Sequence, residues 1–157
     1  MANQQTLDYL KVVGPLLANA KDLARQYKSA TGRPLGITGE VAEYEAVRLL
    51  GLDICEVRQA GYDATCDAGP HQRVQIKGRS LMQKKGGRLG SIDLKKEWDS
   101  VILVTLDERY EPVTMHEAPR GALDAALTRP GSKSRNERGQ LGISQFIRIA
   151  ELRWSAR

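Results

Sequence analysis

The longest apolar run in the chain, Val101–Leu106, constrains the fold more than any other segment. It contains five aliphatic residues and Thr105, so it is far shorter than the roughly 20 residues of a membrane span. A strand without a polar face needs cover on both sides. We therefore expect residues 100–107 to form a central strand in a sheet that carries other layers on both faces, as in α/β proteins.

Hydrophobic spacing and turn residues predict the other elements. Leucine and valine recur at threes and fours over residues 5–29, which predicts a helix that Pro15 should kink or split. The further expected elements are a helix at 39–50, strands near 53–58, 61–67, 72–80 and 112–117, a helix at 119–128, loops at 83–92 and 129–140, and a strand or a helix at 145–152.

This order predicts an α/β fold in which a mixed central β-sheet is flanked by helices. We expect a single domain over residues 1–157, since this length suits one hydrophobic core. Its core should span about 36–117, with N-terminal helices at 5–29 and a basic C-terminal segment at 129–157.

Composition narrows the class of protein. With 41% hydrophobic residues the chain is too apolar to be disordered. The N-terminal residues lack the basic-then-apolar order of a signal peptide, and no apolar stretch is long enough for a membrane span. We expect a cytoplasmic protein that does not bind membranes. The net charge of +5 permits a polyanionic partner such as nucleic acid.

The charges are unevenly distributed along the chain. Residues 71–96 carry a net charge of +7, whereas residues 38–67 carry −5. An acidic cluster beside a basic stretch suits a metal site next to a track for phosphates, although each single charge also suits ordinary solvated surface. The predicted nucleic-acid-binding residues are Arg79, Lys84, Lys85, Arg88, Lys95 and Lys96.

Two neighbouring strands carry the residues with the clearest chemistry. Gln75, Lys77 and Arg79 alternate along the segment 72–80 and therefore share one face. A Gly-Pro turn near residues 68–71 predicts a hairpin that places Asp63 about opposite Lys77. Acid and amide oxygens bind Mg²⁺, and a lysine beside them can orient a water and neutralise phosphate charge. The alternative is a plain cross-strand ion pair, and a register slip by one residue would turn Asp63 to the other face.

The string Gly39–Glu43, followed by Asp63 and then Gln75-Ile76-Lys77, resembles the PD-(D/E)xK, or restriction-endonuclease-like, nuclease superfamily. That family has a helix acid, a strand Asp and an acid-x-Lys strand. The resemblance covers about residues 36–107 and implies a restriction-endonuclease-like core. It also implies that the Ile76 backbone carbonyl is a further metal ligand. The chain departs from the pattern at Gln75, where the family usually has Asp or Glu.

Two glutamates compete for the role of the helix acid. On a helix, Glu43 lies about 60° and Glu40 about 120° from the centre of the apolar stripe. Glu43 should therefore point more nearly toward the sheet, and its position after Gly39 also resembles the family's helix acid. Glu40 lies in the first turn, where an acid favours the helix dipole. We expect Glu43 to lie nearer the metal, with Glu40 as the alternative.

Two functions are compatible with these features. The first is a DNA endonuclease that depends on Mg²⁺, with Mn²⁺ as a possible substitute, and that acts in restriction, repair or phage defence. Asp63, Gln75, Lys77 and Glu43 would be its catalytic residues, and a homodimer would suit cutting of both strands. The second is a non-catalytic protein of the same fold that binds nucleic acid or another partner, because an amide at position 75 supplies no charge to a metal.

Overall fold

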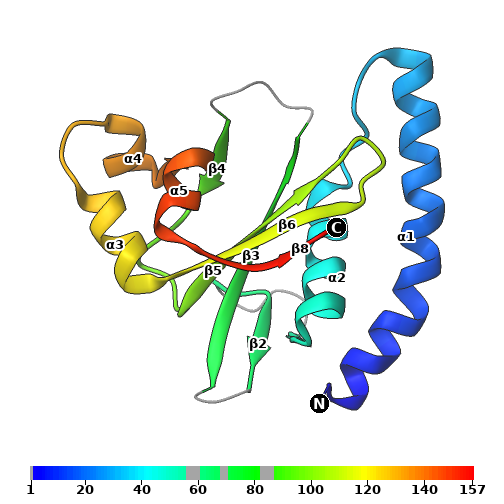
Figure 1. Cartoon of the computed structure of the whole chain (residues 1–157), viewed down its shortest axis with the longest axis horizontal. Helices are drawn as coiled ribbons and strands as arrows, with labels where there is room; N and C mark the ends of the chain where they lie inside the picture. The colour runs from blue at the N-terminus through cyan, green and yellow to red at the C-terminus, as the bar shows by residue number, and fades with distance from the viewer. Residues whose placement is uncertain (1, 56–60, 68–70, 82–86) are drawn as a thin grey trace.

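The computed structural model describes residues 2–55, 61–67, 71–81 and 87–157 (Figure 1). Its helices are α1 (Gln4–Thr31), α2 (Thr38–Leu50), α3 (Arg120–Thr128), α4 (Lys133–Arg138) and α5 (Ile143–Ile149). Its strands are β1 (Asp53–Ile54), β2 (Ala64–Cys66), β3 (Gln72–Ser80), β4 (Arg88–Ser91), β5 (Ser100–Leu106), β6 (Pro112–Pro119), β7 (Gln140–Gly142) and β8 (Glu151–Ser155). No helix in the described ranges is both long and apolar enough to span a membrane.

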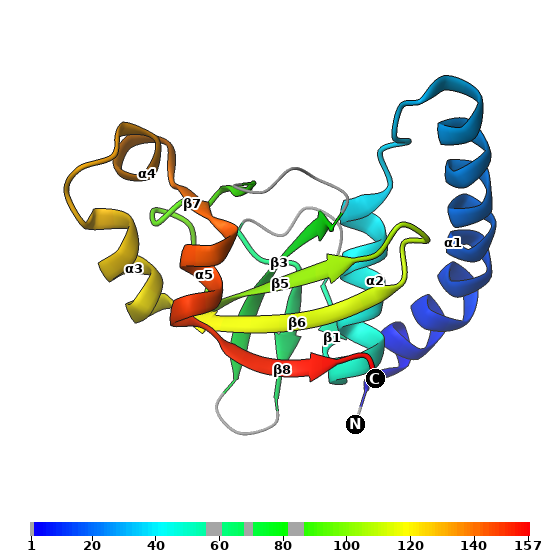
Figure 2. The same cartoon turned by 45° about the horizontal axis from the view of Figure 1, so that its top comes forward.

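A six-stranded mixed sheet lies at the centre of the molecule, in the order β1-β2-β3-β5-β6-β8. Strands β3 and β5 are parallel, and the other neighbouring pairs are antiparallel. Helices α1 and α2 lie on one side of the sheet, and α3, α4 and α5 lie on the other (Figures 1 and 2). Strands β4 and β7 form a small second sheet beside these three helices. The fold is therefore α/β with a mixed sheet flanked by helices, as predicted.

Strand β5 is buried along its whole length, which confirms the expectation of a central apolar strand. Ile102 and Val104 belong to the apolar cluster beneath α1 and α2. Val101 and Leu103 belong to the cluster that contains residues of α3 and α5. Because side chains alternate along a strand, this one segment contributes to both hydrophobic layers.

Several predicted elements differ from the structure. Residues 88–91 lie in a predicted loop but form β4, which pairs with β7. The predicted loop at 129–140 contains α4, and the segment 145–152 contains the end of α5 and the start of β8. Strand β8 pairs with β6 and extends the main sheet beyond the predicted core. Pairing between segments this far apart in the chain leaves no periodic signal in either of them.

Helix α1 is continuous over 28 residues, so Pro15 does not split it, although the helix bends in its N-terminal half (Figure 1). A proline in a helix removes its own backbone hydrogen bond, and its ring crowds the carbonyl of the preceding turn, which bends the helix. Leu10 and Leu17, on either side of it, pack against the core and hold both halves. Gly14 allows close contact with α2, because a Cβ there would lie 2.5 Å from the Tyr44 hydroxyl.

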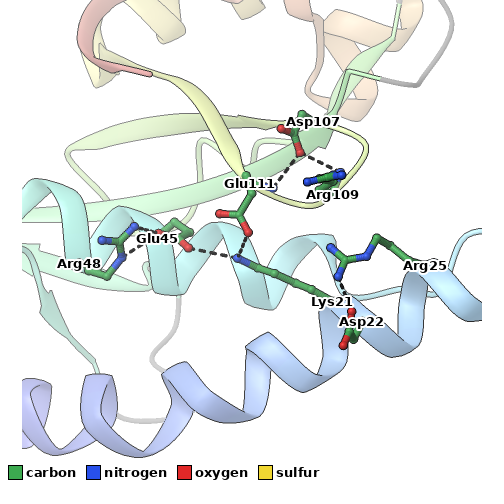
Figure 3. Close-up of polar contacts among 8 residues, drawn as sticks. All are labelled: Lys21, Asp22, Arg25, Glu45, Arg48, Asp107, Arg109 and Glu111. Carbon is green, nitrogen blue, oxygen red and sulfur yellow. Dashed lines mark hydrogen bonds and ion pairs between the residues drawn. The ribbon is translucent and has the colours of Figure 1, made fainter. Parts of the chain in front are cut away.

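Lys21 fixes α1 to the rest of the molecule (Figure 3). Its amine lies 3.3 Å from the Glu45 carboxylate on α2 and 3.2 Å from the Glu111 carboxylate, which precedes β6. Glu45 is buried, and the Arg48 guanidinium lies 2.6 Å from its other oxygen. A buried carboxylate needs such partners, so the position of α1 is tied to that of α2.

A glycine on β3 allows α2 to approach the sheet closely. A Cβ at Gly78 would lie 2.6 Å from the Ala42 Cβ. Val74 and Ile76 lie on the same face of the strand as Gly78 and pack in the same cluster as α2. Gln75 and Lys77 occupy the intervening positions and so face the opposite side of the sheet. Helix α2 and these two polar residues therefore lie on opposite sides of β3.

Candidate functional site

Strand β2 covers only the first part of β3, because it pairs with Gln72, Arg73 and Val74 alone. Asp63 lies just before β2, at the point beyond which no strand among the described residues pairs with this edge of β3, called here its open edge. Its backbone N–H donates to the Val74 carbonyl at 2.9 Å. Its side-chain Oδ2 accepts a hydrogen bond from the Ile76 N–H at 2.8 Å. The carboxylate of Asp63 therefore takes the place that a longer β2 would occupy beside Ile76.

The predicted register is wrong by two residues. Ala64 pairs with Val74, which places Asp63 level with Gln75 instead of Lys77. A one-residue change in the centre of the turn shifts the register by two, and a shift of two keeps each side chain on its face. No ion pair joins Asp63 to Lys77 among the described residues. The turn that sets the register lies mostly outside the described residues.

Two half-buried carboxylates interact at this edge. Burial raises the pKa of Glu43 to about 7, and the charges of Asp63 and then Glu40 add to this effect. Burial also raises the pKa of Asp63, although the hydrogen bond from Ile76 and the charge of Lys77 act in the opposite direction. Glu40 itself is exposed in the first turn of α2. A carboxylate whose pKa is raised by burial and by a neighbouring acid, as for Glu43, would be stabilised in its charged form by a bound cation.

An amide and a backbone carbonyl add two further oxygens. The Oε1 of Gln75 is buried and has no hydrogen-bond partner among the described residues, while its Nε2 donates to the Gly61 carbonyl at 3.4 Å. In a strand, the N–H and C=O of one residue point to the same side. The Ile76 carbonyl therefore points to the same edge as the N–H that Asp63 accepts. A buried acceptor without a partner is costly, and a bound cation would satisfy it.

Lys77 and Arg79 connect β3 to the small sheet. The Lys77 amine donates to the Ser91 carbonyl at 3.0 Å, and the Arg79 Nε donates to the Arg88 carbonyl at 2.6 Å. Burial lowers the pKa of Lys77, the charge of Asp63 raises it, and the charge of Arg79 lowers it further. Lys77 is therefore close enough to Asp63 for their charges to interact, while its amine lies on the β4 side.

The predicted nucleic-acid-binding residues are only partly described. Arg88, Lys95 and Lys96 are exposed, whereas Lys84 and Lys85 lie outside the described residues. Lys96 lies beside the segment that carries Asp63, since a Cβ at Gly61 would be 2.8 Å from the Lys96 Cβ. Residues 61–63 therefore run from a contact with the exposed Lys96 to the Asp63 carboxylate at the edge of β3.

Three residues near the site were not expected from the sequence. Arg73 is paired with Asp99, from Nε to Oδ2 at 3.1 Å and from NH2 to Oδ1 at 3.2 Å, so it is not a free base. Burial and then the charge of Glu43 raise the pKa of Tyr9 to about 12. Tyr9 is therefore close enough to Glu43 for their charges to interact. These partners are more than 20 positions apart in the chain, and no local pattern relates them.

No protein-family model matches the chain, and no curated protein matches its sequence. Within the described ranges, no group of three or more His, Cys, Asp or Glu side chains is arranged to hold a metal. The edge of β3 instead offers two carboxylates, an amide oxygen and a carbonyl. Oxygen donors of these kinds are the ligands that Mg²⁺ prefers, so the residues present fit a divalent cation.

The raised pKa of Glu43 predicts how stability depends on pH without metal. Between its ordinary pKa of 4.5 and about 7, the folded protein holds a proton that the unfolded chain releases, so stability falls as pH rises through this window. Glu43→Gln should remove that loss and raise the free energy of unfolding at pH 8 by about 1–2 kcal/mol, after allowance for solvent screening. Urea denaturation at pH 5 and pH 8 measures the difference.

Glu40→Gln is the matched control, because Glu40 is exposed on the same helix. It should leave most of the pH dependence in place. If Glu43→Gln destabilised the metal-free protein at pH 8, the proposed crowding of carboxylates at this edge would be wrong.

Proposed function

We propose that this protein is a Mg²⁺-dependent nuclease that hydrolyses phosphodiester bonds of DNA, with its active site at the open edge of β3. The observation that carries the proposal is the position of Asp63, whose carboxylate is bonded to the Ile76 N–H and interacts with both Glu43 and Lys77. The order of acid-bearing helix, strand Asp and Gln-x-Lys strand supports membership of the PD-(D/E)xK superfamily.

Four oxygen donors would hold the metal: a carboxylate of Asp63, a carboxylate of Glu43, the Oε1 of Gln75 and the carbonyl of Ile76. Glu40, exposed one turn earlier on α2, would act on it through water. A bound Mg²⁺ would supply Lewis acidity toward the phosphate and would favour ionisation of water. The hydrogen bond from the Ile76 N–H, which holds the Asp63 carboxylate at the edge, supports this assignment.

Lys77 would orient the attacking water and neutralise charge that develops on the phosphate. Its amine now donates to the Ser91 carbonyl at 3.0 Å, so the same donor hydrogens are available to a phosphate oxygen after a rotation of the side chain. Burial lowers the pKa of this amine, and it sits in a half-buried environment. Charge interactions are stronger in such a site than in open solvent.

Cleavage assays with Mg²⁺ or Mn²⁺ on linear, circular and single-stranded DNA test the proposal. We expect Asp63→Asn and Lys77→Ala each to reduce the cleavage rate by about 100- to 1,000-fold, the usual cost of losing one charge-stabilising group. Asparagine retains an acceptor for the Ile76 N–H, so Asp63→Asn should keep the fold. Cutting of circular DNA would identify an endonuclease.

The substitution Gln75→Glu tests whether the missing charge at position 75 weakens the metal site. It adds a charge next to the metal and should tighten Mn²⁺ binding about tenfold, or about 1.4 kcal/mol, by calorimetry.

Cleavage that survives in Asp63→Asn at the wild-type rate would refute the assignment of the active site. A different outcome is that metal raises the melting temperature but neither the natural protein nor Gln75→Glu cleaves any DNA. That result would favour a non-catalytic protein of the same fold that binds nucleic acid or another partner.

The exposed bases predict the salt dependence of DNA binding. Replacing Arg88, Lys95 and Lys96 by Gln should flatten the slope of log affinity against log salt by about 2.7, since each lost phosphate contact contributes about 0.9. The matched control replaces three exposed bases, Lys11 and Lys28 on α1 and Arg33 just after it, and so changes the net charge equally. Equal slopes for the two triple variants, measured by fluorescence anisotropy, would show that the first three bases are ordinary solvated surface.

A further inference from the structure

Helix α1 leaves a row of large apolar side chains in solvent. Val12, Leu16, Leu23 and Tyr27 are 61%, 60%, 58% and 40% exposed. At about 100° per residue, these four side chains fall within about 60° of one another around the helix. Single exposed apolar residues are ordinary, but several of them grouped on one face of a helix indicate an interaction site. In both views the outer side of α1 faces away from the rest of the molecule (Figures 1 and 2).

The spacing of this row reads the same in both directions. Its steps along the chain are four, seven and four residues. In a pair of antiparallel copies related by a two-fold axis near residues 19 and 20, Val12 would lie level with Tyr27 of the second copy. Leu16 would lie level with Leu23 of the second copy. At the centre, Ala20 has a small side chain and Asn19 a short polar one, which permits close approach of the two helices.

We propose that this row is the interface of a homodimer in which two α1 helices pack antiparallel. The charges agree with a second copy as the occupant. The acids beside the row, Asp8 and Asp22, would lie level with Thr31 and Leu17 of the second copy, so like charges do not oppose each other. A contact between copies of one chain is self-complementary in this way when it has two-fold symmetry.

The area available sets the strength of the dimer. With the axis near residues 19 and 20, the two helices overlap over residues 8–31, which is about 36 Å of a helix about 10–12 Å wide, so the contact buries about 360–430 Å² of each copy. The total of about 700–900 Å² lies at the size of weak, reversible complexes. We therefore expect a dissociation constant in the micromolar range or weaker.

Sedimentation equilibrium over about 5–500 µM protein tests the dimer. The natural chain should pass from 17.4 kDa toward twice that mass as concentration rises, and Leu16→Gln/Leu23→Gln should stay at the monomer mass. The control Leu7→Gln/Leu81→Gln removes two other exposed leucines, 49% and 57% exposed, and should dimerise like the natural chain. All these side chains are exposed, so the melting temperatures should be similar. A natural chain that stays monomeric, or a row variant that dimerises equally, would overturn the proposal.

Cysteine crosslinking tests the antiparallel arrangement. Asn19→Cys lies at the axis and should crosslink to itself on oxidation, and an equal mixture of Leu16→Cys and Leu23→Cys should form a mixed dimer. Leu16→Cys alone should not, because its two copies would lie about 10 Å apart along the helices, beyond the reach of a disulfide. The natural chain, with the same Cys55 and Cys66, gives the background. Efficient crosslinking of Leu16→Cys to itself, without the mixed pair, would overturn the antiparallel model.

Discussion

The candidate site depends on one hydrogen bond, from the Ile76 N–H to the Asp63 carboxylate at 2.8 Å. Backbone groups at a strand edge need partners when they are taken out of water. Strand β2 begins at Ala64, opposite Val74, so it does not reach far enough along β3 to pair with Ile76. The side chain of Asp63 supplies the partner instead. The same hydrogen bond holds the Asp63 carboxylate at the edge of β3 to which the Ile76 carbonyl also points. A structural requirement of the sheet thus creates half of an oxygen-rich site.

The other half comes from two faces of β3. Gly78 lets α2 lie close against one face, and this brings Glu43 near Asp63. Gln75 and Lys77 lie on the other face, where the Lys77 amine donates to the Ser91 carbonyl of β4. Glu43 on the helix and Lys77 on the strand lie on opposite sides of the sheet. They can contact the same ligand only at the edge of the strand. No described strand covers this edge of β3 beyond its pairing with β2, and α2 and β4 lie on the two sides of it.

Local patterns in the sequence predict much of this arrangement. Strand β3 matches the expected residues 72–80, and β5 is central because a fully apolar strand must be covered twice. The register of the hairpin was predicted wrongly by two residues, since it depends on a turn whose conformation the residue types do not determine. The β4–β7 pairing and the position of Tyr9 near Glu43 join segments far apart in the chain. Neither has a local signal, and only the packing of the whole molecule reveals them.

The most direct test of this account is to locate a bound divalent ion. Small additions of Mn²⁺ broaden the amide resonances of nearby residues in a nitrogen-15 correlation spectrum. We expect the signals of Asp63, Ile76 and Gly78 to disappear first, and Asp63→Asn to prevent this. The account would be contradicted if broadening began instead at scattered exposed acids, such as Glu108 and Glu137, while the Ile76 signal kept its full intensity.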